Sequence, residues 1–300
     1  MSQFRFDGIW PIMPTPLTVD ERIDEVGTRR VVNFLIEGGS HGLWMFGTRG
    51  EGPNLLPEYH RRALEVAMDE ANGRIPIVTG CGAPGTEHTI ESIRVAESVG
   101  VDLVHVTEPY YYKMKDAEMM AHYQAVADAV KIPLVIYFHD AKYPNVRPGI
   151  CPAVIKEMAA RPNVVGIKVS TSDQRVLQSI VWETQEVTDN FGVMVTDGQM
   201  FVSGMIAGCA GATPAEAAFA PKLFAEMYKL AKQGNWAEAL ELQKTIIPLS
   251  DAITGFGAPS GKAIYAALGL CEEWVSMPLQ RMPEPHRQQL SDLVKTGQYA

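Results

Sequence analysis

The fold class of this 300-residue chain is decided by the run Asn163-Val164-Val165-Gly166-Ile167-Lys168. The run is apolar from Val164 to Ile167, as expected for a strand that is covered on both faces in a parallel sheet, and it ends on a single amine. Burial disfavours the charged form of a lysine, so its pKa falls and its amine becomes a nucleophile that can condense with a ketone. The plainer alternative is a strand-end lysine whose ammonium group reaches solvent.

Similar apolar runs alternate with amphipathic stretches along the first two thirds of the chain. The expected strands are residues 8–13, 42–46, 75–79, 102–107, 133–137, 164–168, 192–196 and 210–213. The expected helices between them are residues 21–37, 57–72, 86–99, 116–130, 152–160 and 173–184. Eight such units predict an α/β fold of the TIM (β/α)8 barrel type. A doubly wound sheet is the alternative, although no Gly-x-Gly-x-x-Gly turn follows the first strand.

The strand pattern stops near residue 215, and the remaining chain is helical in pattern. The expected helices there are residues 215–233, 235–254, 261–268 and 285–295. We therefore expect a barrel over residues 1–225 and a C-terminal helical layer over residues 226–300.

Charge and composition exclude several classes of partner. The net charge is −9 and no basic run is present, which argues against binding to nucleic acid or to an anionic membrane. No apolar stretch approaches the roughly 20 residues that span a bilayer, and the first seven residues lack the apolar region of a signal peptide. The four cysteines show no CxxC spacing and are expected to be reduced thiols, so we expect a cytoplasmic protein.

Active sites of TIM barrels lie at the C-terminal ends of the strands, so the residues found there indicate the chemistry. The second expected strand is followed by Gly47-Thr48-Arg49-Gly50-Glu51, whose backbone N–H groups and hydroxyl suit a carboxylate. A tyrosine triplet at residues 110–112 follows the fourth strand, Tyr137 ends the fifth and Thr213 ends the eighth. Tyrosine hydroxyls can transfer protons, and Lys168 supplies a nucleophile. Each feature alone also has a structural reading, such as a turn that binds nothing or a tyrosine that packs in the core.

The chain carries these residues in an order that resembles the dihydrodipicolinate synthase/N-acetylneuraminate lyase family of class I, Schiff-base-forming aldolases. The resemblance covers nearly the whole chain. The resembling segments are Pro14-Thr15-Pro16, Gly47-Thr48-Arg49-Gly50-Glu51, Gly80-Cys81-Gly82 with Thr86 and Ile90, Pro109-Tyr110-Tyr111, Tyr137, Gly166-Ile167-Lys168 and Gly261-Lys262-Ala263. The resemblance implies a barrel enzyme that uses a lysine imine and needs neither a metal nor an organic cofactor.

The resemblance also implies a role for each matching residue. Lys168 would form the imine with pyruvate or another 2-oxo acid, and Tyr137 would be the general acid/base beside it. Thr48 would hydrogen-bond Tyr137 and help to bind the carboxylate of the 2-oxo acid. Tyr111 would complete a proton relay by reaching across a tight dimer into the neighbouring site, and two such dimers would form a homotetramer.

Departures from the family pattern concern the second substrate. The residues expected to bind substrate are Gly47, Thr48, Arg49, Lys142 and Thr213. Dihydrodipicolinate synthases typically follow the catalytic tyrosine with Asn-Val-Pro-x-Arg-Thr, whose arginine grips a carboxylate, and Lys142 stands at that position here. Lysine cannot reproduce the planar two-pronged contact of arginine. Arg49 replaces the second threonine of the turn, and Val169 replaces an acidic residue after the lysine.

Arg49 admits two interpretations. Its guanidinium group could clamp the carboxylate of an acidic substrate. It could equally pair with Glu51 or Glu108 and only shape the loop.

The sequence thus predicts a class I lyase, aldolase or dehydratase that acts on pyruvate-derived 2-oxo acids of the 2-keto-3-deoxy sugar acid type. Condensation of pyruvate with aspartate semialdehyde, the dihydrodipicolinate synthase reaction, is the alternative. Two hypotheses from other classes stay open: a metal-dependent barrel enzyme that uses His139, His105 and Asp197, and a non-catalytic sensor of a 2-oxo acid. The sequence does not choose between aldol cleavage, condensation and dehydration.

Overall fold

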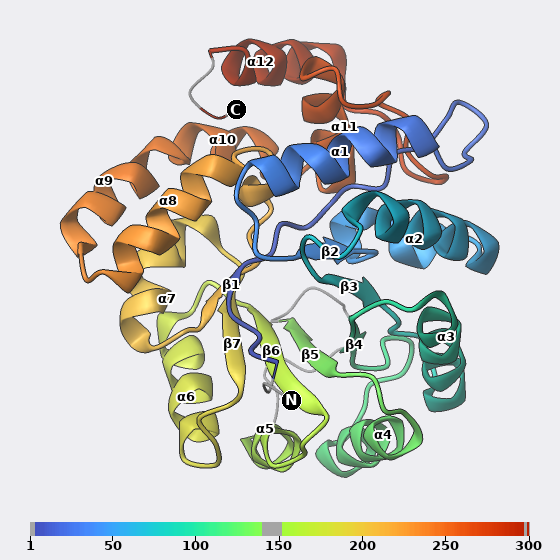
Figure 1. The fold of residues 1–300 in the computed structure, drawn as a ribbon, viewed down its shortest axis with the longest axis vertical. Coiled ribbons are helices and arrows are strands. Elements are labelled where there is room, and N and C mark those ends of the chain that lie inside the picture. Colours follow the sequence, from blue (N-terminus) through green and yellow to red (C-terminus); the bar gives the residue numbers. More distant parts are fainter. Residues whose placement is uncertain (1–3, 140–151, 297–298, 300) are drawn as a thin grey trace. The chain divides into compact units, whose positions relative to one another are not determined.

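The computed structural model of the chain describes residues 4–139, 152–296 and 299. Eight parallel strands each precede a helix, and the chain has the TIM (β/α)8 barrel fold with a C-terminal helical extension, as predicted (Figure 1). The strands are β1 (Gly8–Ile9), β2 (Leu43–Met45), β3 (Ile77–Gly80), β4 (Leu103–Thr107), β5 (Leu134–His139), β6 (Val164–Ser170), β7 (Gly192–Val195) and β8 (Gly211–Ala212). Their order in the sheet is β1-β8-β7-β6-β5-β4-β3-β2.

The helices that follow the strands are α1 (Glu25–Glu37), α2 (Pro57–Ala71), α3 (Thr86–Val99), α4 (Asp116–Ala129), α5 (Pro152–Ala159), α6 (Gln174–Gln185), α7 (Phe201–Ala207) and α8 (Pro221–Lys232). Four more follow in the C-terminal part of the described chain: α9 (Trp236–Thr245), α10 (Ile247–Ile253), α11 (Ala258–Ala267) and α12 (Glu284–Val294). None of the helices in the described ranges is long and apolar enough to span a bilayer.

The chain divides into two compact units, each made of two separate stretches of sequence. Unit 1 comprises Met1–Gly8 and Val78–Thr213, and unit 2 comprises Ile9–Ile77 and Pro214–Ala300. Unit 1 holds the strands β4 to β8 with helices α3 to α7, and unit 2 holds β2, α1, α2 and helices α8 to α12. The expected division at residue 225 stays a prediction.

The parallel ladder of unit 1 places the ends of β4, β5 and β6 at one level. Tyr137 on β5 lies opposite Thr107 on β4 and opposite Lys168 on β6. The interiors of these strands are closed to solvent, with exposed fractions of at most 2% for Ile136 and Ile167. Burial on both faces explains why the strands read as continuous apolar runs in the sequence.

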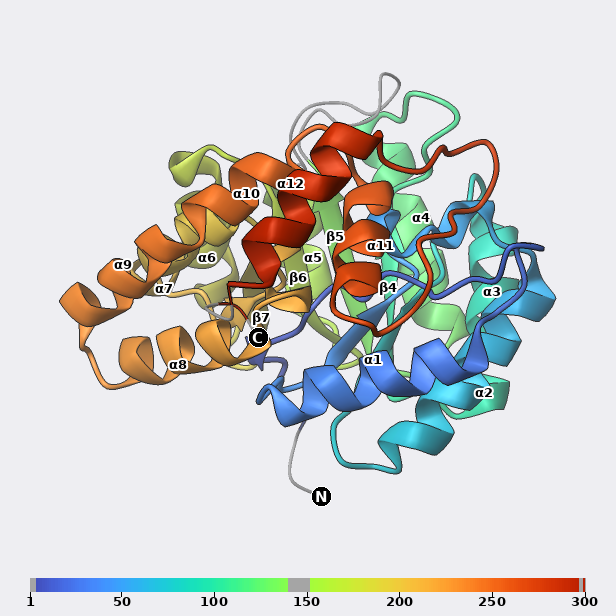
Figure 2. The same ribbon diagram turned by 90° about the horizontal axis from the view of Figure 1, so that it is seen from above.

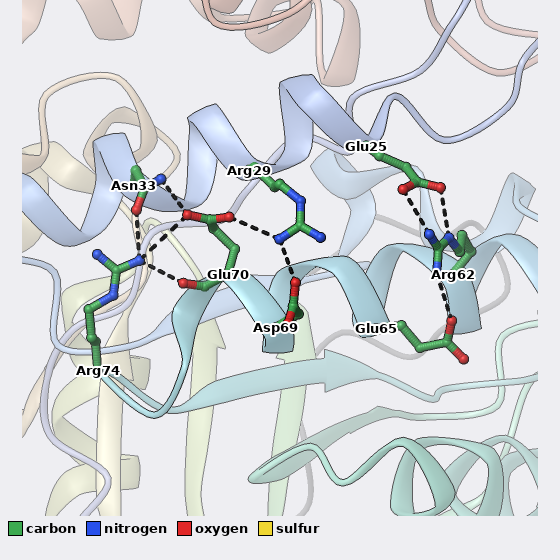
Figure 3. A network of polar contacts seen from close by, with 8 residues as sticks. All are labelled: Glu25, Arg29, Asn33, Arg62, Glu65, Asp69, Glu70 and Arg74. Atoms are coloured by element: carbon green, nitrogen blue, oxygen red, sulfur yellow. Dashed lines mark hydrogen bonds and ion pairs between the residues drawn. The ribbon is translucent and has the colours of Figure 1, made fainter.

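In unit 2, α1 and α2 lie side by side and are joined by charged side chains at their exposed edge (Figure 3). Arg29 on α1 contacts Asp69 and Glu70 on α2 at 2.6 and 3.0 Å, and Arg62 on α2 makes a two-pronged contact with Glu25 on α1. Helices α8 and α9 pack as a second pair, and α11 and α12 as a third (Figure 2). Exposed ion pairs of this kind contribute little stability, so apolar packing holds the helices.

The helices depart from the expected ones at several places. The helix expected from residue 215 is a 3-10 turn over Glu216–Ala218 followed by α8 from Pro221, and α11 begins at Ala258 instead of residue 261. Helix α1 begins at Glu25 instead of residue 21, because the Asp24 side chain accepts a hydrogen bond from the Gly27 amide and caps the helix. The helix expected over residues 235–254 is two helices, because Pro248 lacks the N–H that a continuous helix needs and stands in the first turn of α10. Helix α7, only seven residues long, was not expected.

Candidate active site

Lys168 and Tyr137 lie next to each other at the C-terminal ends of adjacent strands. The Lys168 Nζ atom is 4.1 Å from the centroid of the Tyr137 ring. Both side chains are buried, with exposed fractions of 2% and 4%. A parallel register brings them together because residues opposite each other on neighbouring strands project to the same face. The amine of Lys168 and the ring of Tyr137 therefore lie together in a site that is closed to solvent.

Two histidine rings lie near the ring of Tyr137. The His105 ring, on β4, meets the Tyr137 ring edge-on at 6.0 Å between centroids, and the His139 ring lies at 5.7 Å. Tyr137 and His139 face the same way because side chains alternate along a strand. The hypothesis of a metal-dependent enzyme uses these two histidines and Asp197 as metal ligands. Over residues 4–139 and 152–296, no three His, Cys, Asp or Glu side chains gather in a way that could hold a metal ion.

Thr213 directly follows β8 and has a buried hydroxyl. Its backbone N–H donates to the Val195 carbonyl at 2.8 Å, which continues the ladder between β7 and β8. Its side chain is 0% exposed, and its Oγ1 atom has no hydrogen-bond partner in the described part of the chain. A buried hydroxyl without a partner costs free energy, so a polar ligand atom would be a favourable neighbour.

The Gly47–Glu51 turn belongs to unit 2 and folds as a short 3-10 turn over Thr48–Gly50. The Gly50 amide donates to the Gly47 carbonyl at 2.9 Å, and the Thr15 hydroxyl donates to the Gly50 carbonyl at 2.6 Å. The turn thus uses its carbonyl groups to hold itself together. Across the described ranges, neither the amide nor the hydroxyl of Thr48 donates a hydrogen bond to the protein, so both can serve a bound anion.

Arg49 reaches from the turn to the start of α11. Its Nη1 atom donates to the Gly257 carbonyl at 3.0 Å and to the Ser260 hydroxyl at 3.3 Å. These contacts favour the loop-shaping interpretation, through partners that the sequence did not indicate. Glu51, which was one of the expected partners, contacts a lysine instead.

That lysine is Lys262 on α11, and its ion pair with Glu51 is fully buried. The Nζ and Oε1 atoms are 2.9 Å apart, and both side chains are 0% exposed. Lys262 also donates to the Trp274 carbonyl at 2.5 Å, while Glu51 Oε2 accepts from the Ser276 amide at 2.6 Å and hydroxyl at 2.7 Å. Burial lowers the pKa of Lys262, and the Glu51 carboxylate opposes that shift. In the sequence, Glu51 and Lys262 belong to separate motifs, and their spacing does not indicate an ion pair.

The other predicted residues lie apart from these contacts or outside the described ranges. Tyr111 is 64% exposed and meets the Tyr112 ring edge-on at 5.0 Å, on the loop after β4. Lys142 falls outside the described residues. The expected hydrogen bond from Thr48 to Tyr137 would join the two units and stays a prediction.

Glu108, at the start of that same loop, is a buried carboxyl group that sequence reasoning considered only as a partner for Arg49. It is 4% exposed, and its Oε2 atom has no hydrogen-bond partner within the described residues. Burial raises the pKa of Glu108 to about 7. The Tyr123 hydroxyl is also buried, and its pKa is raised by burial and by the charge of Glu108.

A buried lysine beside a tyrosine ring, at the strand ends of a TIM barrel, suits a class I, Schiff-base-forming lyase. Comparison with known proteins agrees with this class. The chain belongs to the dihydrodipicolinate synthetase family, whose model matches residues 5–297.

Individual relatives have two kinds of name. A 4-hydroxy-tetrahydrodipicolinate synthase of Phenylobacterium zucineum is 33% identical over 283 residues, 94% of each chain. The YagE protein of Escherichia coli K12, provisionally named a 2-dehydro-3-deoxy-D-gluconate aldolase, is 28% identical over 295 residues, 97% of this chain and 96% of that protein.

Solved structures of the family have the same fold. The crystal structure of YagE in complex with pyruvate has a TM-score of 0.91 at 27% identity, with 98% of this chain and 99% of that one covered. Dihydrodipicolinate synthase of Thermotoga maritima has a TM-score of 0.93 at 25% identity, with 99% and 100% covered. These comparisons confirm the predicted family, barrel fold and class of enzyme.

Proposed function

We propose that Lys168 is the nucleophile that forms an imine with pyruvate or a pyruvate-derived 2-oxo acid, and that Tyr137 is its general acid/base. The observation that carries the proposal is the distance of 4.1 Å between the Lys168 amine and the Tyr137 ring, in a place closed to solvent. The phenol hydroxyl can protonate the leaving oxygen of the carbinolamine and later remove a proton from the substrate.

The carboxylate of the 2-oxo acid would bind at Gly47 and Thr48. The Thr48 amide and hydroxyl are donors without protein partners in the described chain, and such donors suit an anion. Arg49 adjoins Thr48, so its charge strengthens the attraction of the turn for acidic ligands even though its guanidinium group contacts Gly257 and Ser260. The buried Thr213 hydroxyl would donate to a second oxygen of the substrate.

The reaction on a 2-keto-3-deoxy acid would proceed in four steps. The Lys168 amine adds to C2, and loss of water gives the iminium ion. Tyr137 takes the proton of the C4 hydroxyl, the C3–C4 bond breaks, and its electron pair forms the enamine as the aldehyde leaves. Protonation at C3 returns the iminium ion of pyruvate, and water releases pyruvate and the free amine. Dehydration would start from the same iminium ion: loss of a C3 proton gives an enamine whose C3–C4 bond is intact, and this enamine expels the C4 hydroxyl group, which leaves with a proton as water.

We also propose a homotetramer in which Tyr111 completes the proton relay in the site of a neighbouring subunit. Tyr111 and Tyr112 are 64% and 68% exposed, and rings of that size are costly to leave in water. A second apolar place lies on the adjacent helices α6 and α7, where Trp182 and Ile206 are 59% and 61% exposed. Two separate apolar places suit a dimer of dimers. A fully active monomer at micromolar concentration would contradict this part of the proposal.

As the substrate we propose a 2-keto-3-deoxy sugar acid. The sequence carries Lys142 where a dihydrodipicolinate synthase carries the arginine that grips the carboxylate of aspartate semialdehyde, and the loss of a two-pronged contact weakens selectivity for it. The name of YagE points to the same substrate class. The alternative is condensation of pyruvate with aspartate semialdehyde, which the names of the relatives at 33% identity favour.

Steady-state kinetics with both substrates tests the choice. We expect kcat/KM for a 2-keto-3-deoxy acid to exceed that for aspartate semialdehyde plus pyruvate by about 10- to 150-fold, the worth of one charged hydrogen-bond pair. A higher kcat/KM for aspartate semialdehyde would make the protein a dihydrodipicolinate synthase.

We propose the cytoplasm as its location. Cys81, Cys209 and Cys271 are free, buried thiols, which is the usual state of cysteine in a reducing compartment.

A further inference from the structure

The Glu51–Lys262 ion pair has no role in the proposed chemistry, yet it occupies the interior of unit 2. Removing two charges from water is costly, and an apolar pair of the same volume is often as stable or more stable. Stability alone therefore gives little reason for a fully buried pair. Glu51 directly follows the turn that carries Thr48, and its own φ of 59° lies in the left-handed region that a side-chain-bearing residue seldom adopts.

The turn is fixed at both of its ends to the same part of unit 2. At one end, Arg49 donates to the Gly257 carbonyl just before α11. At the other end, Glu51 contacts Lys262 within α11 and Ser276 beyond it. The amide and hydroxyl of Thr48 thus belong to a three-residue turn whose direction is set by α11.

Helix α11 also packs on the chain segment that holds the turn in place. A Cβ atom on Gly261 would lie 2.7 Å from the Pro14 side chain, so the helix packs directly on the segment that includes Thr15. The Thr15 hydroxyl in turn holds the Gly50 carbonyl at 2.6 Å. Any side chain at position 261 would have to displace the ring of Pro14, which explains the glycine before Lys262.

We propose that Glu51 and Lys262 are positioning residues, which orient the Thr48 amide and hydroxyl for the carboxylate of the 2-oxo acid. The inference rests on the proposed role of the turn as the carboxylate site. The ion pair and the hydrogen bonds of Glu51 and Lys262 described above lie within unit 2, and none of them involves Lys168 or Tyr137. Its loss should weaken binding of the 2-oxo acid and leave the imine chemistry of bound substrate nearly unchanged.

The rate of borohydride trapping as a function of pyruvate concentration separates the two effects. In Lys262→Met we expect the half-saturating pyruvate concentration to rise about tenfold or more, since small displacements of binding groups have effects of that size. The rate at saturation should stay within about threefold of the wild type, since bound pyruvate meets the same amine. Amide exchange of residues 47–50 should be faster in the variant, which is a readout independent of activity.

A matched control removes the effect of lower stability. Leu35→Ala truncates a 0% exposed side chain on α1 and should lower the Tm without changing the half-saturating concentration. If Lys262→Met does not fold, Ser276→Ala replaces it: it removes one neutral hydroxyl from Glu51 and should raise the half-saturating concentration by a smaller factor.

The outcomes distinguish this inference from the proposed function. A wild-type protein that pyruvate and borohydride do not modify contradicts the proposed function and the inference with it. A wild type that is modified, together with Lys262→Met or Ser276→Ala variants that have the wild-type half-saturating concentration and the wild-type exchange of residues 47–50, overturns the inference alone. An equal rise in Leu35→Ala would also overturn it, because the effect would then follow from stability.

Discussion

Lys168 and Lys262 are two lysines buried to the same degree in different surroundings. Their exposed fractions are 2% and 0%. The Lys262 amine lies 2.9 Å from the Glu51 carboxylate and donates to the Trp274 carbonyl, whereas the Lys168 amine lies over the ring of Tyr137. A carboxylate at contact distance holds an amine in its charged form, and a charged amine is not a nucleophile. Burial alone therefore does not identify a reactive lysine, and the neighbouring groups decide its role.

The largest expected effect is on activity and concerns only one of the two lysines. Lys168→Ala should lose turnover by at least ~10⁴-fold, because the variant lacks the amine that we propose forms the imine. The fold should persist, since removing an amine from the interior also removes its desolvation cost. Steady-state kinetics with circular dichroism as a check of folding measures both. Substantial turnover in this variant would end the distinction between the two lysines.

The next effect sharpens the role of the ring beside Lys168. Tyr137→Phe keeps the aromatic face and removes the hydroxyl, so we expect turnover to fall about 10²- to 10⁴-fold, the usual contribution of a general acid/base. Pyruvate should still be trapped by borohydride. Turnover at the wild-type level would mean that Tyr137 only packs against Lys168.

The free energy of unfolding should change differently when Lys262 and Lys168 are each replaced by methionine. Lys262→Met leaves the Glu51 carboxylate buried without its partner and should lower the free energy of unfolding by about 3–5 kcal/mol. The double variant Lys262→Met/Glu51→Gln should regain much of that loss, because no buried charge is left. Lys168→Met serves as the matched variant in unit 1 and should lower the free energy of unfolding by less, because the group at 4.1 Å from the lost amine is the uncharged ring of Tyr137. Urea unfolding of the four proteins tests the comparison, which fails if Lys168→Met is the more destabilised single variant.

A buried carboxyl group offers a further contrast with Glu51. Burial raises the folded-state pKa of Glu108 from 4.5 to about 7, so the folded protein binds this proton more tightly than the unfolded chain does. Its contribution to stability is therefore fully present below pH 4.5 and is lost as the pH rises through 7, to a total of roughly 3 kcal/mol. Glu108→Gln should flatten the fall in stability between pH 5 and pH 8. An unchanged pH profile in this variant would show that Glu108 does not titrate in that range.

The smallest effect is expected from the exposed ion pairs of α1 and α2. The Arg62 and Glu25 side chains are 49% and 43% exposed, and solvent screens their interaction. Arg62→Gln should leave the Tm nearly unchanged, and any difference should vanish at high salt. If Arg62→Gln lowered the Tm as much as Lys262→Met does, burial would not be the reason why the Glu51–Lys262 pair affects stability.

The sequence predicted the fold, and the proximity of Lys168 and Tyr137, for identifiable reasons. Continuous apolar runs mark buried parallel strands, and the same runs place Lys168 and Tyr137 at strand ends, where the register brings them together. Helix α7 was missed because seven residues hold too few turns for a helical period to stand out.

The Glu51–Lys262 pair could not be predicted, because its members are separated by more than two hundred residues and neither motif indicates a partner for the other. The contacts of Arg49 were missed for the same reason, since Gly257 and Ser260 carry no charge that would suggest a partner for a guanidinium group. Long-range polar contacts depend on tertiary packing, which periodicity within a segment does not encode.

Chemical trapping tests the central claim most directly, because it asks which buried lysine reacts. The wild-type protein is incubated with pyruvate, reduced with borohydride and digested, and the modified peptide is identified by mass spectrometry. Our account predicts one adduct, on Lys168, with Lys262 unmodified and no adduct in Lys168→Ala. An adduct on Lys262, or equal trapping in Lys168→Ala, would contradict it.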